Sequence, residues 1–145
     1  MFLSDVNVLV YAHIQDAANH DKYHAWLHHL LDGDESFGMS DLVLSSFVRI
    51  VTNPRIYSPP TPLDEAFRFT DLLRSHQNCV PVNPGPRHWG IFQRLCREAD
   101  ARGNLVADAY LAALAIESGC EFITADRDFA RFPGLRWRHP LDLRR

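Results

Sequence analysis

Short apolar runs that alternate with longer segments of helical periodicity constrain this chain more than any other feature. The runs cover residues 2–3, 36–39, 80–82 and 122–124. They are too short for helices, which usually need about 10 to 12 residues, and helical patterns separate them. Such alternation is typical of an α/β domain in which helices flank a small, mainly parallel sheet. The periodicity leaves the strand order open.

Four apolar stripes predict the main helices. In each stripe the apolar residues recur at intervals of three and four, so they share one side of a helix. The last stripe is the best formed, with Asn104 as its expected N-cap and Gly119 just beyond its end. The four sets are Tyr23, Trp26, Leu27, Leu30 and Leu31; Phe67, Thr70, Leu72 and Leu73; Trp89, Phe92, Leu95, Cys96 and Ala99; and Val106, Ala109, Tyr110, Ala113 and Leu114.

Size and composition fit one domain that covers residues 1–145, of which 46% are hydrophobic. No window approaches the ~18 uninterrupted apolar residues of a membrane span, and the N-terminus lacks the pattern of a secretory signal. We therefore expect a cytoplasmic protein that does not associate with membranes. Cys79, Cys96 and Cys120 lack paired spacing, so we expect reduced, mostly buried thiols and neither disulfides nor a thiolate zinc site.

Three aspartates lie at positions where an α/β fold usually places its functional side chains. Asp5 follows the first apolar run, Asp126 follows the last, and Asp108 lies in the first turn of the helix that begins near residue 104. Ligands collect at the carboxyl ends of parallel strands, near helix N-termini, so the three carboxylates are expected to converge there. Mg²⁺ prefers such oxygen ligands. The pattern therefore favours a magnesium site.

Each of these aspartates also has a purely local interpretation. Single acids at helix starts are ordinary N-caps or compensate the helix dipole, and only their combination favours a metal site. Polar neighbours could hold the carboxylates by hydrogen bonds, or could serve only local turns. These candidates are Asn7, Asn104, Thr124 and Asp128.

Positive charge is concentrated near the C-terminus, although the net charge is −3. Arginine forks suit bidentate contacts with phosphate, so Arg127, Arg136 and Arg138 are candidate RNA-binding residues. An ordinary solvated surface explains the same charges about equally well. The stretch also contains Arg131, Arg144 and Arg145.

Three segments resemble the acidic motifs of VapC-type PIN domains. They are residues 4–12, which read Ser-Asp-Val-Asn-Val-Leu-Val-Tyr-Ala, residues 103–115, and residues 124–129 with the following 132–135. Their order and spacing agree over essentially the whole chain. The resemblance implies a PIN fold and a Mg²⁺- or Mn²⁺-dependent endoribonuclease that hydrolyses RNA phosphodiesters, with Asp5, Asp108 and Asp126 as ligands. It also implies a homodimer and a cognate VapB-like antitoxin.

One departure from that pattern concerns the helix after the second strand. Such domains commonly carry a glutamate there, whereas residues 42–49 contain no acid and Asp41 is the nearest one. Asp41 could reach the site or could be the helix N-cap. The missing carboxylate also leaves open a catalytically weak PIN-like module that only binds RNA or a protein.

Two other interpretations are less favoured by the residues. His20, His24 and His28 share one helical face and could bind zinc, but no third-ligand motif accompanies them. A phosphatase of the haloacid-dehalogenase type would need a second aspartate two residues after Asp5, where Asn7 stands.

Overall fold

A five-stranded, all-parallel sheet forms the centre of the molecule in the computed structural model, which describes residues 1–142. The strand order is β3-β2-β1-β4-β5. The strands are β1 (Phe2–Ser4), β2 (Phe37–Met39), β3 (Cys79–Pro81), β4 (Glu121–Ile123) and β5 (Trp137–Arg138). The chain builds outward from β1 to β3, then returns to β1 and builds outward on the other side. The order therefore reverses between β1 and β4, where open α/β sheets bind their ligands.

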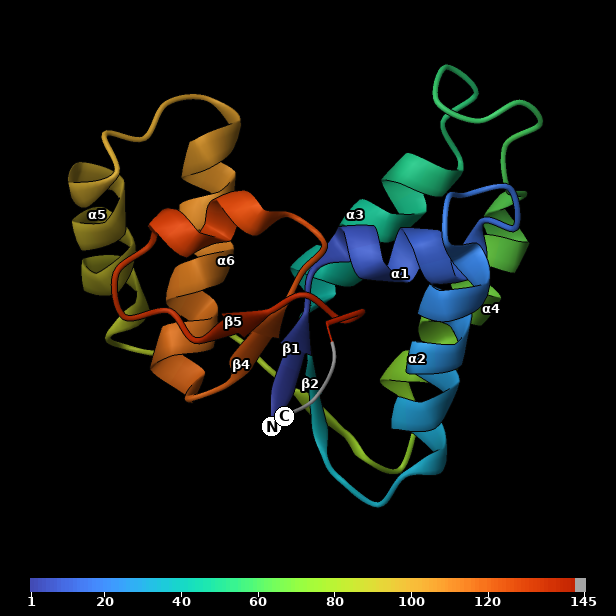
Figure 1. Cartoon of the computed structure of the whole chain (residues 1–145), viewed down its shortest axis with the longest axis horizontal. Coiled ribbons are helices and arrows are strands. Elements are labelled where there is room, and N and C mark those ends of the chain that lie inside the picture. The colour runs from blue at the N-terminus through green and yellow to red at the C-terminus, as the bar shows by residue number, and fades with distance from the viewer. Residues whose placement is uncertain (143–145) are drawn as a thin grey trace.

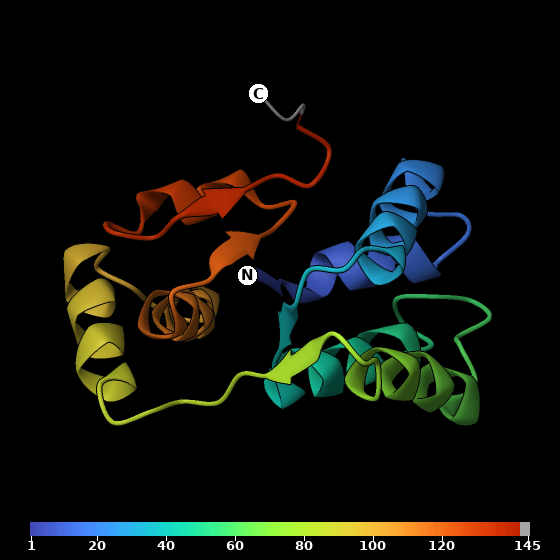
Figure 2. The same cartoon turned by 90° about the horizontal axis from the view of Figure 1, so that it is seen from below.

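Helices cover both faces of this sheet. Figure 1 and Figure 2 show α5 and α6 on one side and α1 to α4 on the other. The helices are α1 (Val6–His13), α2 (His20–Asp32), α3 (Asp41–Val51), α4 (Leu63–Arg74), α5 (His88–Glu98) and α6 (Asn104–Ser118), with the 3₁₀ helix η1 (Arg127–Arg131) after β4.

Each side of the sheet has its own hydrophobic core. One core joins α1 to α4 through side chains such as Leu9 and Phe47, and the other joins α5, α6 and η1 through Leu95, Leu114 and Phe129. Since both faces are covered, the strands read as continuous apolar runs rather than alternating ones. The predicted α/β architecture is confirmed.

Several local predictions were wrong. Trp89 is 62% exposed, and Phe67 and Leu72 are also exposed, so the inward faces of α4 and α5 are rotated from the predicted stripes. On α5, His88 is buried instead, with its Nε2 atom 3.0 Å from the Tyr110 carbonyl oxygen. Polar side chains that find a backbone partner can enter the core, and apolar periodicity does not register them.

The ends of α6 were predicted with mixed success. Gly119 lies in the left-handed region at the C-terminal end, with φ of 70°, as expected from its missing side chain. Asn104 was predicted to be the N-cap, but Gly103 occupies that position and Asn104 is the first residue of the helix. No side chain caps this end of α6 by a hydrogen bond within the described residues. The short strand β5 was not predicted.

The structure also bears on the predictions about the cysteines and about membrane association. Within residues 1–142 the three cysteines are free, but only Cys120 is buried, while Cys79 and Cys96 are half-buried. None of the helices in this part of the chain is both long and apolar enough to span a membrane.

Candidate metal centre at the carboxyl edge of the sheet

Asp5 is held rigidly at the end of the central strand. Its backbone N–H donates to the Ile123 carbonyl oxygen at 2.8 Å, which continues the pairing of β1 with β4. Its side chain caps α1 by accepting from the Val6 N–H at 2.7 Å. The second carboxylate oxygen accepts from the Thr124 hydroxyl at 2.8 Å, and the residue is only 5% exposed. The cap predicted as an alternative role therefore exists, but it uses only one of the two oxygens.

Thr124 connects Asp5 to the loop that carries the second aspartate. The buried Thr124 hydroxyl accepts from the Asp126 N–H at 3.0 Å and from the Asn7 side-chain amide at 3.4 Å. The Asn7 carbonyl oxygen in turn accepts from the Ala125 N–H at 3.2 Å. Asp126 caps η1 by accepting from the Asp128 N–H at 2.9 Å. Two of the predicted supporting residues, Asn7 and Thr124, thus fix the position of the loop relative to Asp5.

The aspartates influence one another electrostatically. Burial raises the pKa of Asp5 to about 6, against hydrogen bonds from Thr124 and Val6 that lower it, and the charges of Asp108 and Asp126 raise it further. The pKa of Asp108 is also raised, chiefly by burial and then by Asp126. Like charges have this effect when they lie close together in a poorly solvated place. The charge of Asp126 thus acts on both Asp5 and Asp108, and the convergence of the three carboxylates on one cation stays a prediction.

This group of carboxylates suits a hydrated divalent cation. In residues 1–142 no three His, Cys, Asp or Glu side chains form a ready-made metal cluster. Over the same range no Arg, Lys or His forms a direct ion pair with Asp5, Asp108 or Asp126. Arg131 compensates their negative charge only in part, by lowering the pKa of Asp108. Mg²⁺ keeps several of its waters and binds through few carboxylates, so it fits oxygen donors that converge without touching.

Asp41 does not act as the N-cap that was one of its two predicted roles. The Ser40 side chain caps α3 by accepting from the Leu42 N–H at 3.2 Å. Asp41 instead accepts from Arg74 on α4 at 2.9 and 3.2 Å, and this ion pair lowers its pKa. Asp41 is absent from the charges that shift the pKa of Asp5 or Asp108.

The arginines proposed for RNA binding are engaged within the molecule. Arg127 pairs with Asp142 at 2.9 Å, and Arg136 donates to the Gly119 carbonyl oxygen at 2.8 Å. Arg138 pairs with Glu121 at 3.1 Å and lies over the Phe2 ring, with its side chain only 25% exposed. Arg144 and Arg145 lie outside the described residues.

Arg131 was counted in the basic stretch but was not singled out as a candidate site residue. It lies one 3₁₀ turn beyond Asp128, and its charge lowers the pKa of Asp108 while burial raises it. Its guanidinium Nη2 is 3.9 Å from the Asp128 carboxylate. Its short distance in the sequence from Asp126 could have indicated a position near the carboxylates. That inference would have required knowing that residues 127–131 form a helical turn.

The three histidines on α2 do not converge on a point. The His20 and His24 rings are 5.4 Å apart and the His24 and His28 rings 4.3 Å apart, packed in a row. They line a hollow together with apolar side chains that include Leu27 and Leu72. Within the described residues these histidines therefore pack as a row and do not form a cluster that could hold a metal ion.

Comparison with known proteins decides the family. The PIN-domain model matches residues 2–135. The chain belongs to the PIN-domain family. This PIN domain is 46% identical over 142 residues to VapC ribonuclease Mb2897 of Mycobacterium bovis, over 98% of this chain and 97% of that relative. It is 45% identical over 140 residues to ribonuclease VapC31 of Mycobacterium tuberculosis, over 97% and 99%. The resemblance to VapC-type PIN domains is therefore confirmed.

Solved structures agree with the fold of this PIN domain. VapBC-1 from nontypeable Haemophilus influenzae superposes with a TM-score of 0.70 at 14% identity and covers 97% of this chain and 98% of that one. Mycobacterium tuberculosis VapC20, described as a sarcin-ricin loop cleaving toxin, gives a TM-score of 0.65 at 15% identity, over 94% and 99%. At such low identities the likeness concerns the fold alone.

Proposed function

We propose that this PIN domain is a Mg²⁺-dependent endoribonuclease, with Mn²⁺ able to substitute, and the toxin of a VapBC-type pair. The observation that carries the proposal is the electrostatic coupling of Asp5, Asp108 and Asp126, which form no direct ion pair among the described residues, near the reversal point of the sheet. The 46% identity to a named VapC ribonuclease supports RNA as the substrate. An RNA substrate and a toxin role place the activity in the cytoplasm.

The residues at the carboxyl edge of the sheet have different roles in this proposal. Asp5, Asp108 and Asp126 would hold the cation, which when bound would neutralise charge on the phosphate and activate a water. Thr124 and Asn7 keep Asp5 and the loop at 124–126 in register, so the ligands need little rearrangement on binding. Because Asp5 is buried and capped at one oxygen, only part of its carboxylate is available to a ligand.

Replacing one ligand tests the assignment. Asp108→Asn keeps the shape of the side chain and removes its charge, so RNA cleavage with Mg²⁺ should fall more than about 100-fold, since loss of even an outer partner of a metal ligand costs 10–100-fold. Asp100→Asn is the matched control, because Asp100 is 87% exposed and pairs with the equally exposed Arg102. Circular dichroism should show both variants folded. Cleavage by Asp108→Asn at the wild-type rate would refute the site, and absence of cleavage by the wild type would favour the binding-module alternative.

We further propose two protein partners. Solved VapBC complexes, including one from Rickettsia felis bound to promoter DNA, support a cognate VapB-like antitoxin. A homodimer is supported by an apolar hollow of about 560 Å³ between α3, α5 and α6, which includes Leu42, Phe92 and Tyr110. Leu42 is 46% exposed there, although it is a large apolar side chain.

A further inference from the structure

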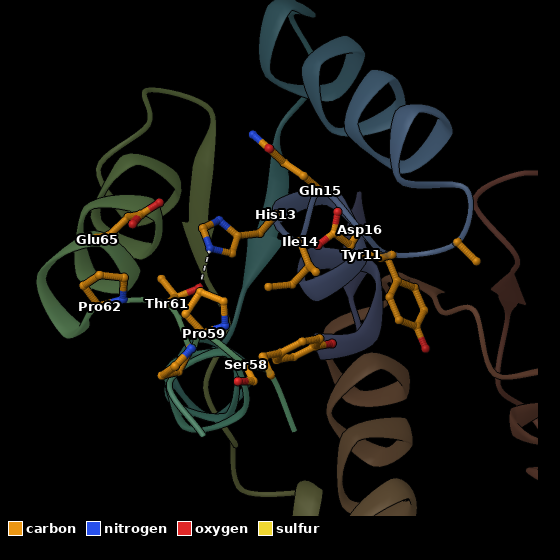
Figure 3. Close-up of a pocket in the computed structure, with 14 residues that line it drawn as sticks. Tyr11, His13, Ile14, Gln15, Asp16, Ser58, Pro59, Thr61, Pro62 and Glu65 are labelled. Atoms are coloured by element: carbon orange, nitrogen blue, oxygen red, sulfur yellow. Dashed lines mark hydrogen bonds between the residues drawn. The ribbon is translucent and has the colours of Figure 1, made fainter. Parts of the chain in front are cut away.

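A further cavity lies at the C-terminal end of α1, the helix whose N-terminal end Asp5 caps. It has a volume of about 550 Å³, within the roughly 300–1,000 Å³ of small-molecule sites. Figure 3 shows residues from the end of α1 and just beyond it, such as Ile14 and Asp16, facing Ser58, Pro59 and Thr61 of the loop between α3 and α4. His13 Nε2 and Thr61 Oγ1 are 3.1 Å apart and join the two walls.

One face of α1 leads from the carboxylates to this cavity. Asn7 and Tyr11 are spaced by four residues, so they lie on the same face of α1, and Ile14 directly follows the last helical residue. All three are half-buried, whereas Val8, Leu9, Val10 and Ala12 are buried in the core. Asn7 hydrogen-bonds Thr124 at the carboxylate group, and Tyr11 and Ile14 line the cavity. Asn7 and Tyr11 are one helical turn apart, about 6 Å along the axis.

The lining suits a nucleobase better than a phosphate. Its charged side chains are Asp16 and Glu65, and it contains neither arginine nor lysine. Burial lowers the pKa of His13, so this side chain adds little positive charge. The aromatic rings of Tyr11 and Tyr57 offer stacking surfaces, and burial followed by the nearby Tyr11 raises the pKa of Tyr57. Unpaired RNA bases are commonly held by aromatic stacking and by hydrogen bonds to their edges.

We propose that this cavity receives the base of an unpaired nucleotide next to the scissile phosphate, and thereby selects the RNA sequence that is cut. The proposal rests on the proposed ribonuclease function. Carboxylates accept hydrogen bonds from exocyclic amino groups, as they do from cytosine N4. Asp16 and Glu65 therefore favour adenine, cytosine or guanine over uracil, which lacks an amino group.

Removing single bases from the substrate tests the cavity directly. The substrates are one cleaved RNA oligonucleotide and a series in which each nucleotide near the cut is abasic or is replaced by uridine. The variants are Tyr57→Ala, which removes a stacking ring, and Asp16→Asn combined with Glu65→Gln, which removes charge at constant shape. Asp34→Asn combined with Glu35→Gln is the matched control, because these exposed acids precede β2 at the opposite edge of the sheet.

At one flanking position the abasic substitution should lower the wild-type kcat/KM about fivefold or more, as expected for a lost stacking contact. Tyr57→Ala should show a similar loss on the intact RNA and no further loss on the abasic RNA. The Asp16 and Glu65 double variant should lose the preference against uracil at that same position, while the control keeps it. If Tyr57→Ala does not fold, the double variant alone decides, because it changes only exposed charges.

Independent, multiplicative effects of base removal and cavity substitution at every position would overturn the proposal while leaving the ribonuclease assignment intact. Failure of the wild type to cleave any RNA would instead reject the proposed function. In that case the same comparison on RNA binding, measured by fluorescence anisotropy, decides whether the cavity holds a base.

Discussion

At the scale of single residues, the behaviour of Asp5 depends on what surrounds it. The carboxylate is buried, near two like charges, and its pKa of about 6 lies roughly two units above the ordinary value of 3.8. The folded protein therefore binds this proton more tightly than the unfolded chain does. Stability of the metal-free protein should fall as pH rises from about 4 to about 6 and stay lower above that, by about 3 kcal/mol from this group.

Asp126→Asn removes one of the charges that raise the pKa of Asp5 and Asp108. The pKa of both carboxyls should fall, and the loss of stability between pH 4 and pH 7 should become smaller than in the wild type. Urea unfolding in EDTA across this range measures the loss, and NMR titration of the carboxyl carbons measures the pKa values. An unchanged Asp5 titration would mean that Asp126 lies too far away to share a cation with it.

Arg131 is the arginine whose charge reaches the carboxylate group. Arg131→Gln should weaken RNA binding regardless of sequence and flatten the salt dependence of log K by about 0.7 for a single strand. Arg138→Gln is the comparison variant, because Glu121 already compensates the Arg138 charge, and we expect its slope to match the wild type. If Arg138→Gln flattens the salt dependence and Arg131→Gln does not, Arg138 contacts RNA, as the sequence predicted.

At the scale of elements, a single hydroxyl group just after β4, that of Thr124, hydrogen-bonds both Asp5 and Asp126. Thr124 donates to Asp5 and accepts from the Asp126 N–H, and it is fully buried. Thr124→Val removes the hydroxyl at nearly constant shape. Stability should fall by about 1–3 kcal/mol, because buried polar groups lose a partner.

The same change should lower cleavage by about 10–100-fold, the usual cost of losing the support of a metal ligand. Thr124→Ser keeps the hydroxyl and should retain most of the activity. Cleavage by Thr124→Val at the rate of Thr124→Ser would show that the position of the loop does not depend on this hydrogen bond.

At the scale of the whole molecule, large apolar side chains remain uncovered on two separate surfaces. Leu42 belongs to the hollow between α3, α5 and α6, whereas Leu72 on α4 borders the hollow lined by histidines. Exposed apolar patches of this kind mark protein interfaces. If the first surface forms the homodimer interface, substitutions of Leu42 and Leu72 must differ in their effect on the molecular mass of the protein in solution.

Leu42→Glu should therefore convert the dimer to a monomer, because the new charge would be buried without a partner in the interface. Leu72→Glu, a change of equal chemistry at a residue 59% exposed, should leave the dimer intact. Light scattering coupled to size-exclusion chromatography gives both masses. A dimer that persists in Leu42→Glu would place the interface elsewhere.

The sequence by itself determined the architecture and supplied the candidate residues of the site. Apolar runs and helical stripes follow from local burial, so the parallel α/β class and most helices were predictable. Asp5 and Asp126 could be proposed because each lies within three residues of the end of a strand, and Asn7 and Thr124 because they neighbour those aspartates. The motifs in register added the family, which the comparisons confirmed.

Only the tertiary structure decided what depends on contacts between distant segments. Arg74 forms an ion pair with Asp41, and Glu121 pairs with Arg138, although neither pair is close in the sequence. The raised pKa of Asp5 and the cavity beside Tyr11 arise in the same way, from burial and from a loop more than 40 residues away in the chain. Local patterns encode which face of an element is apolar, but long-range packing sets the neighbours of each charge, and those neighbours determine its chemistry.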